Sequence, residues 1–303
     1  MQLNGKQCSV IIPTLNAREQ IEGLLGALKG QTRAPDEIIV VDSQSEDGTA
    51  DAVRAVGGVR VLSVQRSAFD HGGTRDWALR LSVGDFVVFM TQDALPADER
   101  CLENLLAPFE DERIAAAGGR QIARPDARPF ERLVRASNYP AESRTWDAGD
   151  IGRLGVRAFL ISDVFAAYRR SAYVAAGGFD HPILTNEDML MAQKLLQAGH
   201  RIAYRGDAAV YHSHRLTLRQ EYRRNYIVGR TMKRYEERFA HVSEMGEGVA
   251  LARRVMAGLL REGELGECCC FAANCAARLL GNRAGRWTQA RQSQDAAREH
   301  ADG

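Results

Sequence analysis

Apolar residues along the first 120 positions come in short blocks that alternate between two spacings. Short, mostly apolar runs at 8–12, 37–41, 59–64 and 85–90 are typical of buried β-strands. Between them, apolar side chains recur at helical spacing in four segments, at 17–29, 49–56, 73–81 and 98–109. This alternation predicts an α/β fold with a Rossmann-like, mostly parallel sheet that is flanked by helices.

The pattern changes after this region. Residues 121–160 are rich in Arg, Pro and Gly and predict loops, whereas 162–169, 171–176 and 187–198 again resemble regular elements. Residues 217–239 and the remainder of the chain predict amphipathic helices that end in a polar tail. We therefore expect a domain over 1–216, with halves at 1–120 and 121–216, followed by a helical carboxyl-terminal region over 217–303.

Composition excludes some classes of protein. The chain has 303 residues, 45% of them hydrophobic, which is enough for one well-buried core. Its 40 basic and 39 acidic residues nearly balance, and this argues against a nucleic-acid binder. No apolar run approaches the roughly 20 residues that cross a bilayer. The polar segment 1–7 lacks the apolar core of a signal peptide, so we expect a cytoplasmic location.

The cysteines also agree with a cytoplasmic location. Four of the six cysteines lie within 268–275, and no C-x-x-C pair is present. Adjacent cysteines on a helix point in different directions, so a thiolate metal site is disfavoured. Small apolar residues in a reducing compartment explain them better.

Candidate chemistry starts at the ends of the predicted strands, where ligands bind in parallel sheets. The polar residues there are Asn16, Asp42, Arg66 and Asp93. A carboxylate such as Asp42 can accept the N3–H of a uracil or thymine ring. The small polar residues that follow it, with Ser45 and the run 47–49, are equally explained as a turn that caps a helix, although that explanation does not require an Asp at the strand end.

A second candidate is the segment 69–75, which contains Gly72, Gly73 and Arg75. Glycines at a helix start let the backbone approach a phosphate, and a guanidinium neutralises a diphosphate oxygen. A simple glycine turn explains the two glycines as well. The third candidate is Asp93, which lies just past a very apolar strand. Because an unpaired buried carboxylate is costly, a Mg²⁺ or Mn²⁺ ion that bridges to a diphosphate is one way to compensate it.

Two further segments carry acids and imidazoles. Glu187 and Asp188 open a predicted helix, where its dipole alone would favour them, but where a general base would also be well placed. His212 and His214 lie two residues apart near a predicted strand end and therefore point to the same side. Histidines are often structural, but a pair near Asp93 suggests a metal site.

Taken in this order, the segments resemble the inverting glycosyltransferases of family 2, which have the GT-A fold. The resemblance runs from about residue 9 to about residue 218, on "SVIIPTLNA", "VDSQSEDGT", "GGFD" and "NEDMLMAQKLLQAG". It implies a nucleotide-binding half over 1–120 and an acceptor half over 121–216. The donor site that it implies comprises Pro13, Thr14, Asn16, Asp42, Ser43, Ser45, Arg66, Gly72, Gly73, Arg75, Gln92 and Asp93.

The resemblance also assigns roles. It implies that Asp188, beside Glu187, is the catalytic base, and that Asp93 and His212 bind the metal, with His214 as the alternative ligand. The family's Asp-x-Asp metal motif reads Thr91-Gln92-Asp93 here, so the first acid is absent. "FMTQDALP" and "FDHGGTRDWAL" look most like the bacterial rhamnosyltransferase branch. That branch is a group of hexosyltransferases that use dTDP-rhamnose to build surface polysaccharide.

Other classes stay open. A sugar nucleotidyltransferase also pairs a Rossmann-like half with a metal carboxylate, but the segment "PTLNAREQ" after the first strand contains no glycine. A catalytically silent module of a polysaccharide assembly complex is a further alternative. A dinucleotide dehydrogenase is disfavoured, because no G-x-G-x-x-G follows the first strand. The expected partners are a dTDP- or UDP-sugar donor, a divalent metal and a glycan or lipid-linked glycan acceptor.

Arginines alternate with apolar residues in the carboxyl-terminal region. This pattern fits a helical face on an anionic membrane, and equally a solvated surface or an oligomer interface. The arginines concerned are Arg253, Arg254, Arg261, Arg278, Arg283 and Arg286.

Overall fold

A computed structural model describes residues 5–240 and 245–301. The chain forms two compact units, and each is described by itself. The first consists of Met1–Arg124, Asn138–Pro182 and Glu187–Ser213. The second consists of Pro125–Ser137, Ile183–Asn186 and His214–Gly303.

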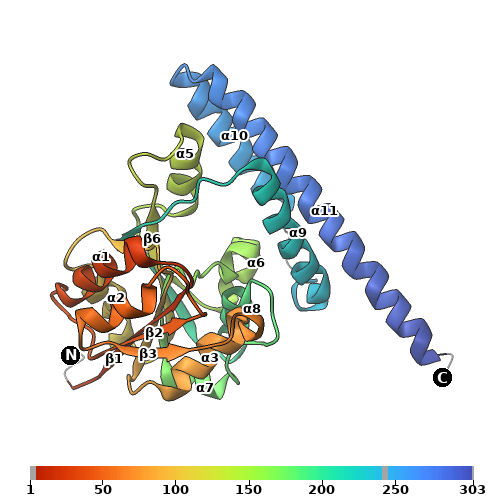
Figure 1. Cartoon of the computed structure of the whole chain (residues 1–303). Helices are drawn as coiled ribbons and strands as arrows, with labels where there is room; N and C mark the ends of the chain where they lie inside the picture. The colour runs from red at the N-terminus through yellow and green to blue at the C-terminus, as the bar shows by residue number, and fades with distance from the viewer. Residues whose placement is uncertain (1–4, 241–244, 302–303) are drawn as a thin grey trace. The chain divides into compact units, whose positions relative to one another are not determined.

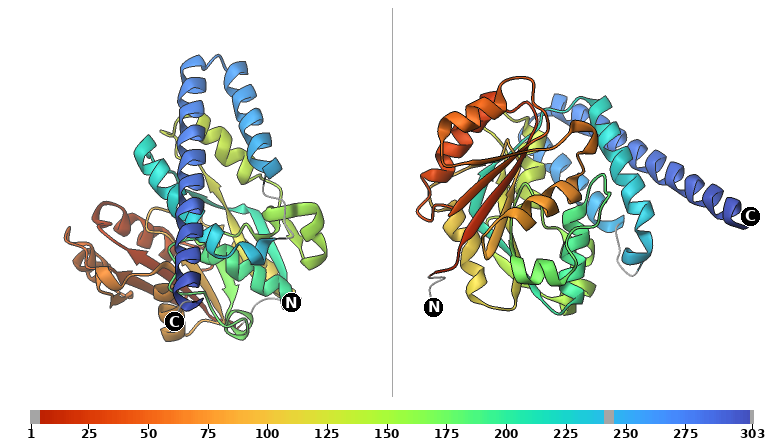
Figure 2. Two further views of the ribbon diagram at one scale, coloured as in Figure 1. Left: turned by 90° about the vertical axis from the view of Figure 1, so that its right-hand side faces the viewer. Right: turned by 60° about the horizontal axis from the view of Figure 1, so that its bottom comes forward.

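The first unit is built on a nine-stranded sheet with the order β3-β2-β1-β4-β8-β6-β9-β5, in which β7 also pairs with β9 (Figure 2). The strands are β1 (Cys8–Thr14), β2 (Glu37–Asp42), β3 (Arg60–Ser63), β4 (Phe86–Met90), β5 (Leu95–Pro96), β6 (Ile114–Ile122), β7 (Arg144–Trp146), β8 (Phe165–Arg169) and β9 (Arg201–Tyr211).

Strand polarity brings many strand ends to one edge of this sheet. β1 to β4 are mutually parallel. β8 is antiparallel to both β4 and β6, and β9 is parallel to β6. β6 and β9 therefore run in the same direction as β1 to β4, and all six end at the edge where β8 begins. The predicted mostly parallel sheet is confirmed, whereas the antiparallel β8 in its middle was not predicted.

Helices cover the sheet because their apolar residues recur on one side. In α1, the side chains at i, i+3, i+4 and i+7 are all buried, and these are Ile21, Leu24, Leu25 and Leu28. They pack in one cluster with alternate residues of the strands, such as Val10, Ile12, Val40 and Val88. The helices of this unit are α1 (Arg18–Lys29), α2 (Thr49–Val56), α3 (His71–Leu81), α4 (Cys101–Leu106), α6 (Ile151–Leu154), α7 (Arg170–Ala175) and α8 (Glu187–Gln197).

The sequence pattern did not predict several elements, among them β6 and α5. β6 has small residues where strands usually carry β-branched ones, as in Ala115, Ala116 and Ala117. Its Gly119 lies so close to Phe165 that an added Cβ would be 2.2 Å from the ring, so close packing rather than propensity explains the composition. α5 (Pro129–Asn138) lies inside 121–160, where the sequence predicted loops.

The second unit is helical, as expected for 217–303, and it also contains α5. Its other helices are α9 (Leu218–Arg234), α10 (Met245–Arg261) and α11 (Leu265–Ala301). Thr217 starts α9 through a reciprocal capping box with Gln220. Val255, Leu259 and Phe271 form a small core against neighbouring apolar residues.

α9 and α11 run side by side in the same direction (Figure 1). Their backbones approach closely because two glycines of α11 face α9. An added Cβ on Gly281 would lie 2.3 Å from the carbonyl oxygen of Tyr222, and one on Gly285 would lie 2.0 Å from that of Tyr226. Among the described residues, no helix is both long enough and apolar enough to cross a bilayer.

Candidate active site

The ends of β1 and β2 hold the buried carboxylate that the sequence indicated. Asp42 is the last residue of β2, and it lies opposite Thr14 in the register of β1. Its Oδ1 accepts from the Thr14 hydroxyl at 3.4 Å, and its Oδ2 accepts the backbone N–H of Ser45 at 3.0 Å. These contacts hold the carboxylate at the carboxyl edge of the sheet, where a nucleotide base is expected.

Hydrogen bonds join the loops after β1, β2 and β4. The N–H of Asn16 donates to the Ser45 hydroxyl at 2.8 Å. The Gln92 amide exchanges two hydrogen bonds with the backbone of Leu15, at 2.8 and 3.2 Å. Gln92 therefore fixes the loop after β1 against the turn that carries Asp93.

Backbone conformation also singles out these loops. In the described part of the chain, the non-glycine residues with positive φ are Asn16 at 51°, Gln44 at 59° and Asn186 at 66°. The first two lie in the loops just described, and the third directly precedes Glu187. Such left-handed residues concentrate at functional sites, where surrounding contacts hold them in place.

The remaining residues of the predicted donor site lie around these loops. Pro13 is half-buried on β1, and Ser43 is buried beside Asp42. The Ser43 hydroxyl has no hydrogen-bond partner within the described residues. Arg66 is exposed, and its backbone N–H donates to the Gln44 side chain at 3.0 Å.

In the segment 70–75, groups that the sequence suggested for diphosphate binding contact other protein groups. Asp70 caps α3 by accepting the N–H of Gly73 at 2.6 Å, so this donor is already used. Gly73 also lies against His181, and Gly72 is buried in the same turn. The guanidinium of Arg75 is buried and donates to Glu187 at 3.0 Å.

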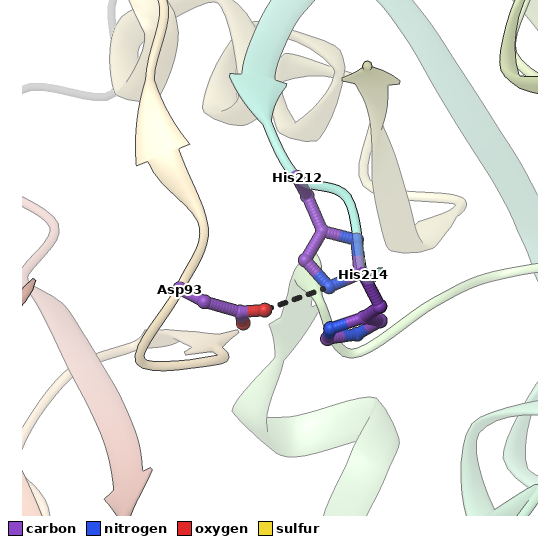
Figure 3. Close-up of side chains that lie close together, drawn as sticks. All are labelled: Asp93, His212 and His214. Carbon is purple, nitrogen blue, oxygen red and sulfur yellow. Dashed lines mark ion pairs between the residues drawn. The ribbon is translucent and has the colours of Figure 1, made fainter. Parts of the chain in front are cut away.

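Asp93 and His212 meet at the same edge of the sheet (Figure 3). Asp93 follows β4 and His212 follows β9, and their Oδ2 and Nε2 atoms are 3.3 Å apart. On its other side, His212 Nδ1 lies 3.0 Å from Oε1 of Gln121, whose amide nitrogen donates to the Tyr139 hydroxyl. Because Oε1 can only accept a hydrogen bond, the imidazole nitrogen that faces it, Nδ1, carries the proton.

The donor set fits a divalent cation. With its proton on Nδ1, His212 turns the Nε2 lone pair toward a carboxylate oxygen, and such a pair requires a proton or a cation between its atoms. A ligating histidine whose other nitrogen is held by a hydrogen bond is typical of metal sites. One ligand atom each of Asp93, His212 and His214 lie within 4.8 Å of one another. His214 is two residues beyond His212 along the chain.

A cluster of acids lies at the start of α8. Asp188 Oδ1 accepts the N–H of Met189 at 2.7 Å, and Oδ2 accepts the N–H of Asp163 at 3.3 Å. Burial, followed by the charge of Glu187, raises the pKa of Asp188 to about 7. Burial also raises the pKa of Asp163 well above its usual range. A carboxylate with a pKa near 7 is matched to general-base catalysis at neutral pH.

Short chain connections link the acid cluster to the metal candidate. The N–H of Thr91 donates to the carbonyl of Val164 at 3.3 Å, and Val164 directly follows Asp163. Asp163 contacts Asp188, whereas Asp93 lies two residues after Thr91. Asp42, Asp93, Asp188 and His212 therefore all belong to the carboxyl edge of one sheet.

The sequence did not single out two residues of this site. Gln121 orients His212, and Asp163 contacts Asp188, yet neither stands in a recognisable motif. Gln121 is the penultimate residue of β6, a strand that the pattern did not predict. Asp163 lies two residues before β8, so a correct placement of that strand would have drawn attention to it.

Comparison with known proteins agrees with this geometry. The sequence profile of glycosyl transferase family 2 matches residues 9–175. The O-antigen chain rhamnosyltransferase RfbN of Salmonella typhimurium is 39% identical over 222 residues, which cover 73% of this chain and 71% of that protein. The O-antigen chain rhamnosyltransferase WbaN of Salmonella anatum is 40% identical over 223 residues, which cover 73% and 70%.

Solved structures share the fold. The mannosyltransferase PcManGT from Pyrobaculum calidifontis, in complex with GDP-Man and Mn²⁺, superposes with a TM-score of 0.59 at 21% identity, over 94% of this chain and 84% of that one. Glucosyl-3-phosphoglycerate synthase from Mycobacterium tuberculosis, with Mn²⁺ and UDP-glucose, gives 0.54 at 20% identity, over 80% and 83%.

The fold and the site thus define a glycosyltransferase with the GT-A architecture. The chain belongs to glycosyltransferase family 2. The resemblance to the rhamnosyltransferase branch, first based on short motifs, is confirmed by the two Salmonella relatives.

Proposed function

We propose that the protein transfers rhamnose from dTDP-rhamnose to a hydroxyl of a growing surface polysaccharide, with inversion at the anomeric carbon. The observation that carries the reaction type is Asp188, a half-buried carboxylate whose pKa, raised to about 7, suits a general base. The choice of sugar rests on the names of the two Salmonella relatives.

The chain's own residues supply the steps of a single displacement. Asp42 accepts the N3–H of the pyrimidine, and the loops with Pro13, Thr14, Asn16, Ser43 and Ser45 surround the nucleoside. Arg66, exposed at the rim of these loops, approaches the diphosphate. Gly72 and Gly73 shape the turn below it.

Asp188 takes the proton of the acceptor hydroxyl while that oxygen bonds to the anomeric carbon. The bond from this carbon to the diphosphate oxygen breaks, and its electron pair leaves with the nucleotide. Asp93 and His212, with His214 as a further ligand, would hold a Mg²⁺ or Mn²⁺ ion that offsets the charge developing on the leaving diphosphate.

Nucleotide release separates this proposal from its alternatives. We expect release of dTDP from dTDP-rhamnose in the presence of Mn²⁺ and a lipid-linked or soluble glycan acceptor, and slower turnover of UDP-glucose and UDP-galactose. Formation of a nucleotide sugar from a sugar phosphate and dTTP would instead identify a nucleotidyltransferase. Binding of dTDP-rhamnose without turnover, over a panel of acceptors, would identify a silent binding module.

The second unit gives a proposal about location. We propose that the enzyme works in the cytoplasm and contacts the inner face of the membrane through α11. Leu279, Leu280 and Trp287 are more than half exposed on this helix. Arg283 is exposed beside them, and the guanidinium of Arg291 lies 4.9 Å from the centre of a Trp287 ring. Apolar side chains among arginines suit a surface of anionic lipid headgroups.

Liposome flotation tests this contact. We expect the protein to float with vesicles that contain anionic lipid and to remain behind with purely zwitterionic vesicles, because both apolar and cationic groups contribute. Leu280→Glu should abolish flotation, whereas Glu262→Gln, at an exposed position between α10 and α11, should not. If wild type and Leu280→Glu float with anionic vesicles to the same extent, this face of α11 does not bind the membrane. Concentration-dependent dimers in light scattering, lost in Leu280→Glu, would assign it to an oligomer interface instead.

A further inference from the structure

Two carboxyl groups and one guanidinium share a buried space beside the proposed base Asp188, which is the third carboxyl group of the cluster. Arg75, Asp163 and Glu187 are 4%, 3% and 5% exposed. Arg75 Nη1 donates to Glu187 Oε1 at 3.0 Å, and the Tyr168 hydroxyl donates to Asp163 Oδ1 at 2.8 Å. The N–H of Asp163 donates to Asp188. The proposed donor-binding and metal-binding roles use none of Arg75, Asp163 and Tyr168.

The charges of this cluster do not balance if every acid is ionised. One guanidinium faces three carboxylates, and unpaired buried charges are costly in a medium that solvates them poorly. At least one of the carboxyl groups must therefore retain a proton. The hydrogen-bond and ion-pair partners of each acid indicate which of them holds this proton.

Asp163 is the acid that is least supported as an anion. Glu187 is close to the guanidinium, and Asp188 accepts two backbone N–H groups, both of which favour the charged form. Asp163 accepts the Tyr168 hydroxyl alone. Its Oδ2 lies 3.8 Å from Arg75 Nε, and neither of these two atoms has a hydrogen-bond partner in the part of the chain that the structure describes.

We propose that Asp163, Arg75 and Tyr168 are positioning residues for Asp188, and that Asp163 keeps the proton of the cluster so that Asp188 is ionised. This inference rests on the proposed role of Asp188 as the base. Arg75 neutralises Glu187, Tyr168 orients the Asp163 carboxyl, and the backbone of Asp163 holds Asp188. The network thus leaves Asp188 ready to accept the proton of the acceptor hydroxyl.

Several groups set the proton affinity of Asp188. Arg75 lowers its pKa and Glu187 raises it. The titratable and charged groups that face the cluster are His71 and Arg75 on α3, Asp163 and Tyr168 at β8, Tyr173 on α7, and Glu187 and Asp188 on α8. Because a base must be deprotonated, turnover should rise with pH through about 7 in the wild type.

Two substitutions test the assignment through the pH profile of kcat. Arg75→Met removes a positive charge, so the acid limb should move to higher pH by on the order of one unit. Asp163→Asn replaces a protonated carboxyl by a neutral group of the same shape, so the midpoint of the acid limb should stay in place whatever happens to turnover. Arg75→Lys should restore the midpoint, and it serves as the variant to measure if Arg75→Met does not fold.

The results that would contradict this inference differ from those that would contradict the proposed function. A shift of the Asp163→Asn limb to lower pH by a unit or more would mean that Asp163 is charged, and would overturn the inference. An unshifted Arg75→Met limb would exclude coupling of Arg75 to the base. ¹³C NMR of carboxyl-labelled aspartates, assigned with Asp163→Asn and Asp188→Asn, measures both titrations without turnover. If the wild type transfers no sugar, the proposed function fails, but the NMR titrations still decide which acid holds the proton.

Discussion

Asp188→Asn is expected to lower kcat by roughly 10²–10⁴, because an amide cannot take the proton of the acceptor hydroxyl. The substitution keeps the size of the side chain and one acceptor oxygen. It also removes a charge that burial and Glu187 disfavour, so we expect the protein to remain folded. Rates of nucleotide release at saturating donor and acceptor, compared with the wild type at pH 8, measure the effect.

The control for this variant is Asp51→Asn. Asp51 is exposed on α2 and pairs with Arg54 within the same helix, so its loss should leave both turnover and unfolding temperature near the wild-type values. Near-normal turnover of Asp188→Asn would remove Asp188 from the mechanism. A loss of activity accompanied by a lower unfolding temperature would instead indicate a structural role.

Asp93→Asn is expected to lower kcat by about 10²–10³, the usual cost of removing one electrostatic stabiliser of a developing negative charge. The carboxylate is the anionic member of the candidate ligand set, and an amide binds Mg²⁺ or Mn²⁺ more weakly. The wild type should lose activity in EDTA and recover it with Mn²⁺, whereas the variant should gain little from added metal. Depletion of free Mn²⁺, followed by electron paramagnetic resonance, reports binding without catalysis.

Asp98→Asn is the matched control, since Asp98 lies five residues further along the chain and is exposed. Because Thr91 and Gln92 contribute no carboxylate, we expect Mn²⁺ to bind substantially only when dTDP is present to supply phosphate oxygens. Unchanged Mn²⁺ binding in Asp93→Asn with dTDP would contradict the ligand assignment. Activity in EDTA that matches activity in Mn²⁺ would exclude a metal requirement.

The sequence was sufficient to find Asp42, Asp93 and Asp188 because each stands near a strand or helix boundary. Asp42 ends one apolar strand, Asp93 lies three residues beyond another, and Asp188 is in the first turn of a helix. The alternation of strands and helices alone therefore places Asp42 and Asp93 at one edge of the sheet. His212 required the further assumption that β9 runs parallel to β4. The structure meets this condition through β8, which is antiparallel to both β4 and β6.

The sequence could not reveal partners that come from distant segments. Arg75 looked like a phosphate ligand because it follows two glycines, but its contact with Glu187, 112 positions away, depends on how α3 and α8 pack. β6 was missed because its alanines and glycines carry little intrinsic strand preference. Close packing around Gly119 makes those small residues necessary, and such packing is visible only in three dimensions.

The contact between α9 and α11 restricts how the carboxyl-terminal part of such enzymes can diverge. With Gly281 and Gly285 against opposing carbonyl groups, any larger residue at either place would separate the two helices. Homologues that retain this parallel pair should therefore keep minimal side chains four positions apart, even where the surrounding sequence has drifted beyond alignment. That spacing offers a marker for tracing the helical region across distant members.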